Sequence, residues 1–215
     1  MEDIYGDRPV DVVLRGLDIA IASGVLLLWS PVLGAVGVAI RVTSGPPVVY
    51  RGARVGRRGQ IFTMLKLRTL APDAETRLGP YYGPELTRRT KLEVTRLGRL
   101  LRALHVDELP QFWNVLRGEM SVVGPRPIRP KFFAELSTEI PQYWQRLVVR
   151  PGVTGFAQTR MTREESWSDK LAHDLEYIAD RSVTLYLQVI AATAWRMLRR
   201  AAGGGRLPES RTARD

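Results

Sequence analysis

An uncharged apolar run near the N-terminus constrains what this 215-residue chain can fold into. The run extends over 22 residues, from Ile19 to Ile40. As one straight helix it would be about 33 Å long, enough to cross a hydrocarbon core of about 30 Å. A membrane span, a re-entrant segment and a buried helix of a soluble domain are therefore the three alternatives.

Two features favour the re-entrant segment. Ser30-Pro31 lies in the middle, where proline removes a hydrogen bond and bends a helix, and each half is then only about 14–16 Å long. Basic residues flank the run on both sides, which places both ends in the cytoplasm by the positive-inside rule: Arg8 and Arg15 before, and Arg41, Arg51, Arg54, Arg57 and Arg58 after. We therefore expect a helix-break-helix with its break at Ser30-Pro31. Asp18, at the edge, should pair with Arg15 one turn earlier.

Composition limits the partners and the chemistry. Lysine and arginine total 32 against 22 acidic residues, which gives a net charge of +10. Such a chain attracts nucleic acid, an anionic membrane or phosphorylated substrates. The absence of cysteine excludes disulfides, thiolate nucleophiles and cysteine-based zinc sites. Because there are only two histidines, a bound metal should be held by carboxylates, which favours Mg²⁺.

The remaining pattern predicts an α+β, mostly helical fold. Pro47–Tyr50 and Ile61–Leu67 read as the strands of a small β-hairpin, and 71–91 as a loop that could contain one short helical turn. Helical spacing or start signals mark Thr95–Leu104, Asp107–Leu116, Pro130–Leu136, Pro141–Val148 and Asp169–Asp180. Ser182–Trp195 is too short for a comfortable span and has a basic end, so we expect interfacial amphipathic helices around one catalytic domain. The expected organisation is a membrane segment (1–43), a catalytic domain at the cytoplasmic membrane face (44–202) and a disordered tail (203–215).

Asp107-Glu108 is the strongest candidate for chemistry. An acidic pair at a helix start is ordinarily a cap that favours the helix dipole. This pair, however, stands among Arg96, Arg99, Arg102, Arg117, Arg126 and Arg129, with Lys66 and Arg68 ending a nearby strand. Such cations lower a carboxylate pKa and keep it ionised, so that an aspartate can attack phosphorus. The adjacent glutamate can hold a divalent ion that neutralises phosphate oxygens.

Two Pro- and Gly-rich segments are further candidates. In Gly124-Pro125-Arg126-Pro127, the prolines restrict the backbone and can fix the guanidinium of Arg126 for bidentate phosphate binding, although an ordinary turn is an equal alternative. In Arg150-Pro151-Gly152-Val153-Thr154-Gly155, the glycines could let backbone N–H groups approach a phosphate, a weaker signal than a full P-loop.

Together these motifs resemble the bacterial sugar transferase family, the monotopic polyprenyl-phosphate phosphoglycosyl transferases, in its minimal form. The resemblance covers about residues 10 to 200. It rests on Arg15…Asp18, Ser30-Pro31, Arg54-Val55-Gly56, Lys66-Leu67-Arg68-Thr69-Leu70, Thr95-Arg96-Leu97-Gly98-Arg99, the continuous block from Asp107 to Pro127, and Arg150 to Gln158.

The resemblance implies a reaction and a set of roles. Asp107 would attack the sugar-linked phosphate of a UDP-sugar, UMP would leave, and polyprenyl phosphate would take the phosphosugar from the enzyme to initiate glycan assembly. Glu108 would bind Mg²⁺, and Arg126 would contact substrate phosphate. For the other basic residues we infer phosphate binding: Lys66, Arg68, Arg102 and Arg150. The expected location is the cytoplasmic face of the bacterial inner membrane, in contact with anionic phospholipid and without nucleic acid; a homodimer is left open.

Four positions depart from the family pattern. They are His105, Leu147, the Thr159–Thr162 stretch and Tyr186. Two alternative functions are a catalytically inactive membrane scaffold of the same family and a basic nucleic-acid-binding protein. The first would be favoured if Asp107 or Glu108 were absent. The second leaves the interrupted apolar run and the acidic pair unexplained.

Overall fold

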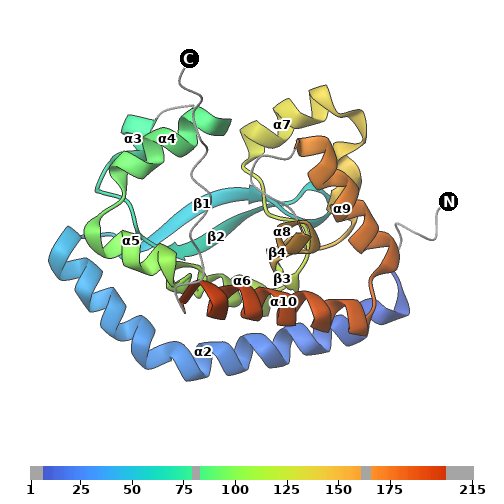
Figure 1. The fold of residues 1–215 in the computed structure, drawn as a ribbon, viewed down its shortest axis with the longest axis horizontal. Coiled ribbons are helices and arrows are strands. Elements are labelled where there is room, and N and C mark those ends of the chain that lie inside the picture. Colours follow the sequence, from blue (N-terminus) through green and yellow to red (C-terminus); the bar gives the residue numbers. More distant parts are fainter. Residues whose placement is uncertain (1–6, 79–82, 161–165, 202–215) are drawn as a thin grey trace, which may run out of the picture.

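Helices dominate the fold, and they surround a small β-hairpin (Figure 1). The computed structural model describes residues 7–78, 83–160 and 166–201. The strands are β1 (Val49–Val55), β2 (Ile61–Leu67), β3 (Ser121–Val123) and β4 (Gly152–Thr154). The helices are α2 (Pro9–Ser44), η1 (Arg57–Gly59), α3 (Ala74–Leu78), α4 (Gly83–Glu93), α5 (Arg96–Ala103), η2 (Val106–Glu108), α6 (Gln111–Leu116), α7 (Pro130–Glu139), η3 (Pro141–Val148), α8 (Phe156–Arg160), α9 (Trp167–Asp180) and α10 (Val183–Ala201).

Helix α2 runs through Ser30-Pro31 without interruption. Pro31 has no N–H to donate to the carbonyl of Leu27, four residues earlier. The hydroxyl of Ser30 donates to that oxygen instead, at 2.9 Å. The predicted helix-break-helix is therefore one helix in its hydrogen bonding, because the serine satisfies the carbonyl that proline leaves open. Figure 1 shows α2 bending along the underside of the molecule.

Both ends of α2 pack on the same domain. Leu14 and Ala22 join the main core cluster with Val115, Met120 and Tyr186. Ile40 packs with residues of β2, α5 and η2 in a second cluster: Leu67, Leu101 and Val106.

The most apolar part of α2 faces outward. Leu27 and Leu28 are 80% and 75% exposed, and only 6% of the most apolar window of the helix is buried. The apolar middle of α2 is therefore not part of the core of this domain. By length and composition α2 is able to cross a membrane.

The predicted hairpin is confirmed. Strands β1 and β2 pair antiparallel, with Tyr50 opposite Lys66 and Arg54 opposite Phe62. Because side chains alternate along a strand, Tyr50, Arg54 and Lys66 share one face. Strand β1 begins at Val49 rather than Pro47 and continues to Val55.

The predicted loop at 71–91 instead contains α3 and α4. An ion pair between Arg77 and Glu93, at 2.6 Å, joins the two segments. An antiparallel bridge between Leu70 and Val94 holds their base. These non-local contacts override the Pro, Gly and charge content that suggested a loop.

The predicted helix Asp107–Leu116 is divided into η2 and α6. His105 takes a left-handed conformation (φ 56°) ahead of η2. Asp107 accordingly lies inside a 3₁₀ turn and is buried, so it is not the exposed N-cap of a helix.

Strands β3 and β4 form a short parallel pair that the sequence pattern does not predict. It joins the two Pro- and Gly-rich segments: Gly124 N–H donates to Thr154 O and Gly152 N–H donates to Pro125 O, both at 2.9 Å. A Cβ on Gly152 would lie 2.1 Å from Gly124 N. Because glycine has no side chain, the backbones of the two segments can come into direct contact at this position.

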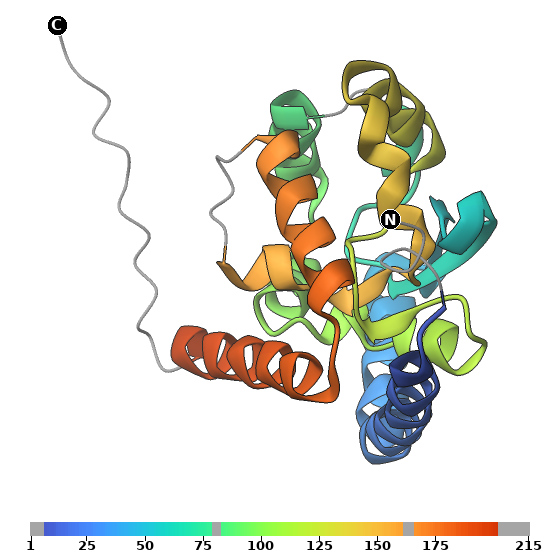
Figure 2. The ribbon, with the colours of Figure 1, turned by 90° about the vertical axis from the view of Figure 1, so that its right-hand side faces the viewer.

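Helix α10 lies beside α2 on the underside of the molecule in both views (Figures 1 and 2). Tyr186 of α10 donates its hydroxyl to Asp18 Oδ1 at 2.9 Å, and Ser121 Oγ and Val122 N–H donate to the same oxygen at 2.8 Å. Asp18 thus ties α2 to β3 and α10, while its distance to Arg15 is a longer 4.0 Å. The predicted tail at 203–215 and the departures at Met161 and Thr162 lie outside the described residues.

Candidate active site

The acidic pair lies between the hairpin and the start of α6. Asp107 is buried, with only 7% of the residue exposed to solvent. Glu108 accepts a hydrogen bond from Lys66 Nζ at 2.6 Å, and the side chains of these two residues are 21% and 19% exposed. Since Lys66 comes from β2, the structure brings the predicted strand-end lysine to the predicted acidic pair.

The two carboxylates have opposite pKa shifts. Burial raises the pKa of Asp107, and the charge of Glu108 raises it further against the opposing effects of Lys66 and Arg102. This corrects the expectation that the surrounding cations leave the pKa of Asp107 lowered: they are outweighed by desolvation. Burial also acts to raise the pKa of Glu108, but Lys66 and Arg126 hold it below its usual value.

Arg102 is the second basic neighbour of the pair. Its Nε donates to Thr69 Oγ1 at 2.8 Å, which fixes the side chain between α5 and the end of β2. Burial lowers the pKa of Arg102, while Asp107 and Glu108 act in the opposite direction. The guanidinium therefore lies within the electrostatic reach of both carboxylates.

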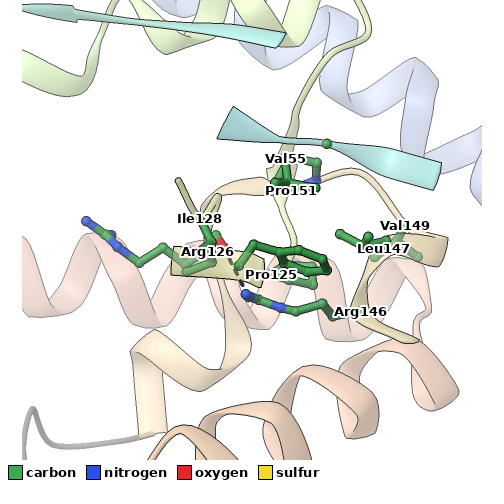
Figure 3. Close-up of a pocket in the computed structure, with 10 residues that line it drawn as sticks. Val55, Pro125, Arg126, Ile128, Arg146, Leu147, Val149 and Pro151 are labelled. Atoms are coloured by element: carbon green, nitrogen blue, oxygen red, sulfur yellow. Dashed lines mark hydrogen bonds between the residues drawn. The ribbon is translucent and has the colours of Figure 1, made fainter. Parts of the chain in front are cut away.

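Arg126 is held through its backbone and leaves its side chain exposed. The buried guanidinium of Arg146 donates to Arg126 O at 3.0 Å and to Asp174 Oδ2 at 2.6 Å. Figure 3 shows the side chain of Arg126 directed away from Arg146. Arg146 thus holds the backbone of the Pro-Arg-Pro segment, whereas the guanidinium, which we expected the prolines to fix, is exposed and acts on the charge of Glu108.

The sequence pattern did not single out Arg54 or Gln111 for this region. Arg54 shares a face of the hairpin with Lys66. Burial is the largest cause that lowers the pKa of Arg54, and the nearby charges of Arg129 and Arg126 lower it further. The register of the hairpin would have indicated this shared face. Gln111, one turn after the pair, is 2% exposed, and its Nε2 has no hydrogen-bond partner among the described residues. The sequence alone shows only a polar residue one turn after the acidic pair, because its burial becomes visible in the structure.

Two predicted phosphate ligands lie away from the pair. The guanidinium of Arg68 donates to Ser44 O, Gly45 O and Pro46 O, each at 2.6 Å. Arg68 thus hydrogen-bonds the carbonyl groups at the C-terminus of α2. Arg150 donates to Gly118 O at 2.8 Å, beyond the far end of α6. The structure therefore groups Lys66, Arg102 and Arg126 around Asp107 and Glu108, and leaves Arg68 and Arg150 out of that group.

A small cavity lies behind the Pro-Arg-Pro segment (Figure 3). It encloses about 240 Å³, counted to its mouth, and its lining is mostly apolar, with Val55, Phe133 and Leu147 among the residues. Leu147, one of the departures from the family pattern, therefore packs at this cavity. Neither Asp107 nor Glu108 lines it.

Comparison with known proteins gives the same family as the motifs. The family model described as bacterial sugar transferase matches residues 10–200. A UDP-glucose:undecaprenyl-phosphate glucose-1-phosphate transferase of Caulobacter vibrioides is 38% identical over 191 residues, which cover 86% of this chain and 69% of that protein. Exopolysaccharide production protein PSS of Rhizobium leguminosarum bv. phaseoli is 35% identical over 203 residues, 90% of this chain and 100% of the relative.

A third relative is longer than the region it shares with this chain. A UDP-N-acetylgalactosamine-undecaprenyl-phosphate N-acetylgalactosaminephosphotransferase of Aeromonas hydrophila is 36% identical over 184 residues, 84% of this chain. The chain spans 42% of that protein's length. With the family model matched over nearly the whole chain, and with the acidic pair, Lys66 and Arg126 assembled in one place, this protein belongs to the bacterial sugar transferase family.

Proposed function

We propose that this protein transfers a sugar-1-phosphate from a UDP-sugar to a polyprenyl phosphate. The observation that carries the proposal is the acidic pair itself. Asp107 is buried beside Glu108, and Lys66, Arg102 and Arg126 surround them with positive charge. Relatives whose names describe UDP-sugar:undecaprenyl-phosphate transferases support the substrate class. The name of the Rhizobium relative supports a role in exopolysaccharide production.

Asp107 is the proposed nucleophile. Its carboxylate oxygen forms a bond to the phosphorus that carries the sugar, while the bond from that phosphorus to the bridging oxygen breaks and UMP leaves with the electron pair. An oxygen of the polyprenyl phosphate then bonds to the same phosphorus. The Asp107–phosphorus bond breaks, which restores the carboxylate.

The basic residues bind and orient the phosphates. Arg126, with a fixed backbone and an exposed fork of donors, suits bidentate contact with a diphosphate. Lys66 contacts Glu108, and Arg102 lies within the electrostatic reach of both carboxylates. Both would stabilise charge that develops on the transferred phosphoryl group.

Glu108 is the residue that would hold Mg²⁺. Its lowered pKa keeps it ionised, and Lys66 engages Oε1 of its carboxylate. No group of three or more metal-ligating side chains occurs in the part of the chain that the structure describes. This fits Mg²⁺, which commonly takes one or two carboxylates together with substrate phosphates and water. The ion would neutralise phosphate oxygens when bound.

Helix α2 is proposed as a re-entrant membrane segment on the cytoplasmic side of the inner membrane. Leu14 and Ile40 both pack on one domain, whereas a straight span would carry one end to the opposite face. Exposed apolar residues of α10 extend the same underside, with Trp195 68% and Leu198 65% exposed. Arg199 follows them, which suits an interfacial helix beside anionic lipid.

UMP release tests the assignment of Asp107. Purified full-length protein in detergent or nanodiscs, with Mg²⁺ and a panel of UDP-sugars, should release UMP, and Asp107→Asn should abolish the release. Asp180→Asn removes an exposed carboxylate at the end of α9 and should retain it. Retained turnover in Asp107→Asn would contradict the role of nucleophile.

Withholding the lipid acceptor separates covalent from direct transfer. A phosphosugar adduct should then accumulate on the peptide that contains Asp107, as mass spectrometry can detect. If UMP is released only with the acceptor present and no adduct forms, transfer is direct. If the protein with its native acidic pair releases no UMP with any UDP-sugar, the scaffold alternative is favoured.

A further inference from the structure

A second cavity has four arginines in its lining. It lies where the start of α2 meets η1, the segment before β4 and the end of α9, and Figure 2 turns this end of α2 toward the viewer. It encloses about 440 Å³, counted to its open mouth. Its charged lining consists of Arg15, Arg57, Arg150, Arg181, Asp11 and Asp18.

This cavity and the acidic pair lie at opposite ends of α6. Arg15 donates to Val115 O at 2.7 Å and to Leu116 O at 2.9 Å, which are the last residues of α6. Asp107 and Glu108 precede the first residue of that helix, which has 6 residues and is therefore about 9 Å long. None of the residues grouped around Asp107 lines the cavity.

The carboxylates at the cavity are already engaged by the protein. Asp11 accepts two hydrogen bonds from Arg181, at 2.7 and 3.0 Å. Asp18 accepts three hydrogen bonds from β3 and α10 through Oδ1, and its Oδ2 stays 4.0 Å from Arg15. At the rim, exposed Asp7 pairs with Arg57.

The positive charge is less fully engaged. Arg150 uses only Nε, toward Gly118 O, and its two Nη atoms have no partner among the described residues. Burial and then the charge of Arg150 lower the pKa of Arg15, and the same two causes act on Arg57. These guanidinium groups therefore act unfavourably on one another, although Asp7 pairs with Arg57 and the charge of Asp18 offsets part of the effect on Arg15.

Capping of α6 explains only part of the cluster. Cations at a helix C-terminus are favourable, which accounts for Arg15 and for Nε of Arg150. It does not account for Arg57, whose Nε donates to Val148 O of η3, or for the unpartnered donors of Arg150.

We propose that this cavity is a second anion site, which binds a phosphate group between Arg57 and Arg150 with Arg15 behind it. A phosphate oxygen pair suits the planar donors of two guanidinium groups. The bound group would link α2, the hairpin end and the segment before β4, and would relieve the repulsion between the arginines. The phosphate could belong to a phospholipid headgroup or to a free phosphate.

The test measures thermal unfolding of the full chain in dodecyl maltoside micelles, which carry no phosphate. One arm compares these micelles with the same micelles supplied with phosphatidylglycerol. The other compares inorganic phosphate with chloride at equal ionic strength, without added lipid. Binding to the folded state should raise the midpoint by about 2–4 °C. A rise in the first arm alone identifies the lipid headgroup, and a rise in the second identifies free phosphate.

Variants assign the rise to the cavity. Arg150→Gln and Arg57→Gln should each remove it, whereas Arg51→Gln, which deletes an exposed arginine of β1 outside the cavity, should retain it. If Arg150→Gln fails to fold, Arg57→Gln is compared with Arg51→Gln instead. Arg57→Gln loses one hydrogen bond to the backbone, from Nε to Val148 O. The proposal is overturned if neither arm stabilises the unsubstituted protein, or if all three variants respond alike. UMP release plays no part in the readout, so a failure of the catalytic assignment would be seen separately.

Discussion

At the scale of single residues, the two carboxylates of the acidic pair are neighbours in the chain but have different surroundings and opposite pKa shifts. Glu108 is joined to Lys66, and its pKa is lowered, while Asp107 is buried and its pKa is raised. One carboxylate is thereby kept as an anion that can hold a cation. The other is less solvated and more basic, which suits the role of nucleophile that we propose for it.

Lys66→Gln should lower kcat for UMP release by about 10²-fold, because one preorganised positive charge at the transferred phosphate is lost. Steady-state kinetics with saturating UDP-sugar measure the change. Lys131→Gln removes an exposed lysine of α7 and should leave kcat unchanged. Equal activity of the two variants would remove Lys66 from the site.

Asp11 gives a pH-dependent contribution to stability. Burial acts to raise its pKa, but hydrogen bonds from Arg181 and from Arg8 N–H hold the pKa below its usual value. An acid whose pKa is lower in the folded state stabilises the fold above its unfolded pKa of about 3.9, and this stability is lost as pH falls through the folded value.

Asp11→Asn should therefore lower the unfolding midpoint near pH 6, and the difference from the unsubstituted protein should shrink below about pH 4. Thermal unfolding between pH 3 and pH 7 measures this. Asp180→Asn, at an exposed position, serves as the comparison. A difference that is constant over the whole range would contradict the linkage.

Sequence motifs predict some residues of the site correctly and assign others to it wrongly, for a physical reason. Lys66, Arg126 and the acidic pair belong to motifs whose chemistry is local, and the structure brings them together. The three carbonyl partners of Arg68 come from the end of α2, more than twenty residues earlier, and no local pattern records that contact.

At the scale of elements, long periodic segments were predictable and short paired ones were not. The hairpin and α5 follow from alternation and helical spacing, and Thr95 caps α5 by accepting from Gly98 N–H at 2.9 Å. Strands β3 and β4 have three residues each and pair across more than thirty positions, which leaves too little periodicity to detect. Gly124, which follows β3, and Gly152, in β4, carry the information, since each permits a close backbone approach.

Gly152→Ala should destabilise the fold by about 1–3 kcal/mol or more, because the new Cβ would lie 2.1 Å from Gly124 N and 2.2 Å from Thr154 O. Chemical or thermal unfolding measures the loss. Gly16→Ala on α2 meets no atom within 4 Å and should be neutral or stabilising. If the two variants unfold alike, the β3–β4 contact is not tight.

At the scale of the whole molecule, two helices that are far apart in the sequence, α2 and α10, expose apolar residues on the same side of the protein. Helices α2 and α10 lie along that side in both views (Figures 1 and 2), and the basic and acidic residues of the site stand on the elements above. For the transfer that we propose, a site in that position would receive a soluble nucleotide sugar and a lipid phosphate from the same side. This arrangement requires that both ends of α2 stay on one face of the membrane.

Site-specific labelling can test that requirement, because the chain has no cysteine and each introduced thiol is the only one. Glu2→Cys and Arg51→Cys lie beyond opposite ends of α2, and both should react with an impermeant maleimide only in inside-out vesicles. Leu28→Cys, on the exposed apolar part of the helix, should be protected on both sides. Labelling of Glu2→Cys and Arg51→Cys from opposite faces would mean that α2 spans the bilayer. In that case the packing of Leu14 and Ile40 on one domain could not persist in the membrane.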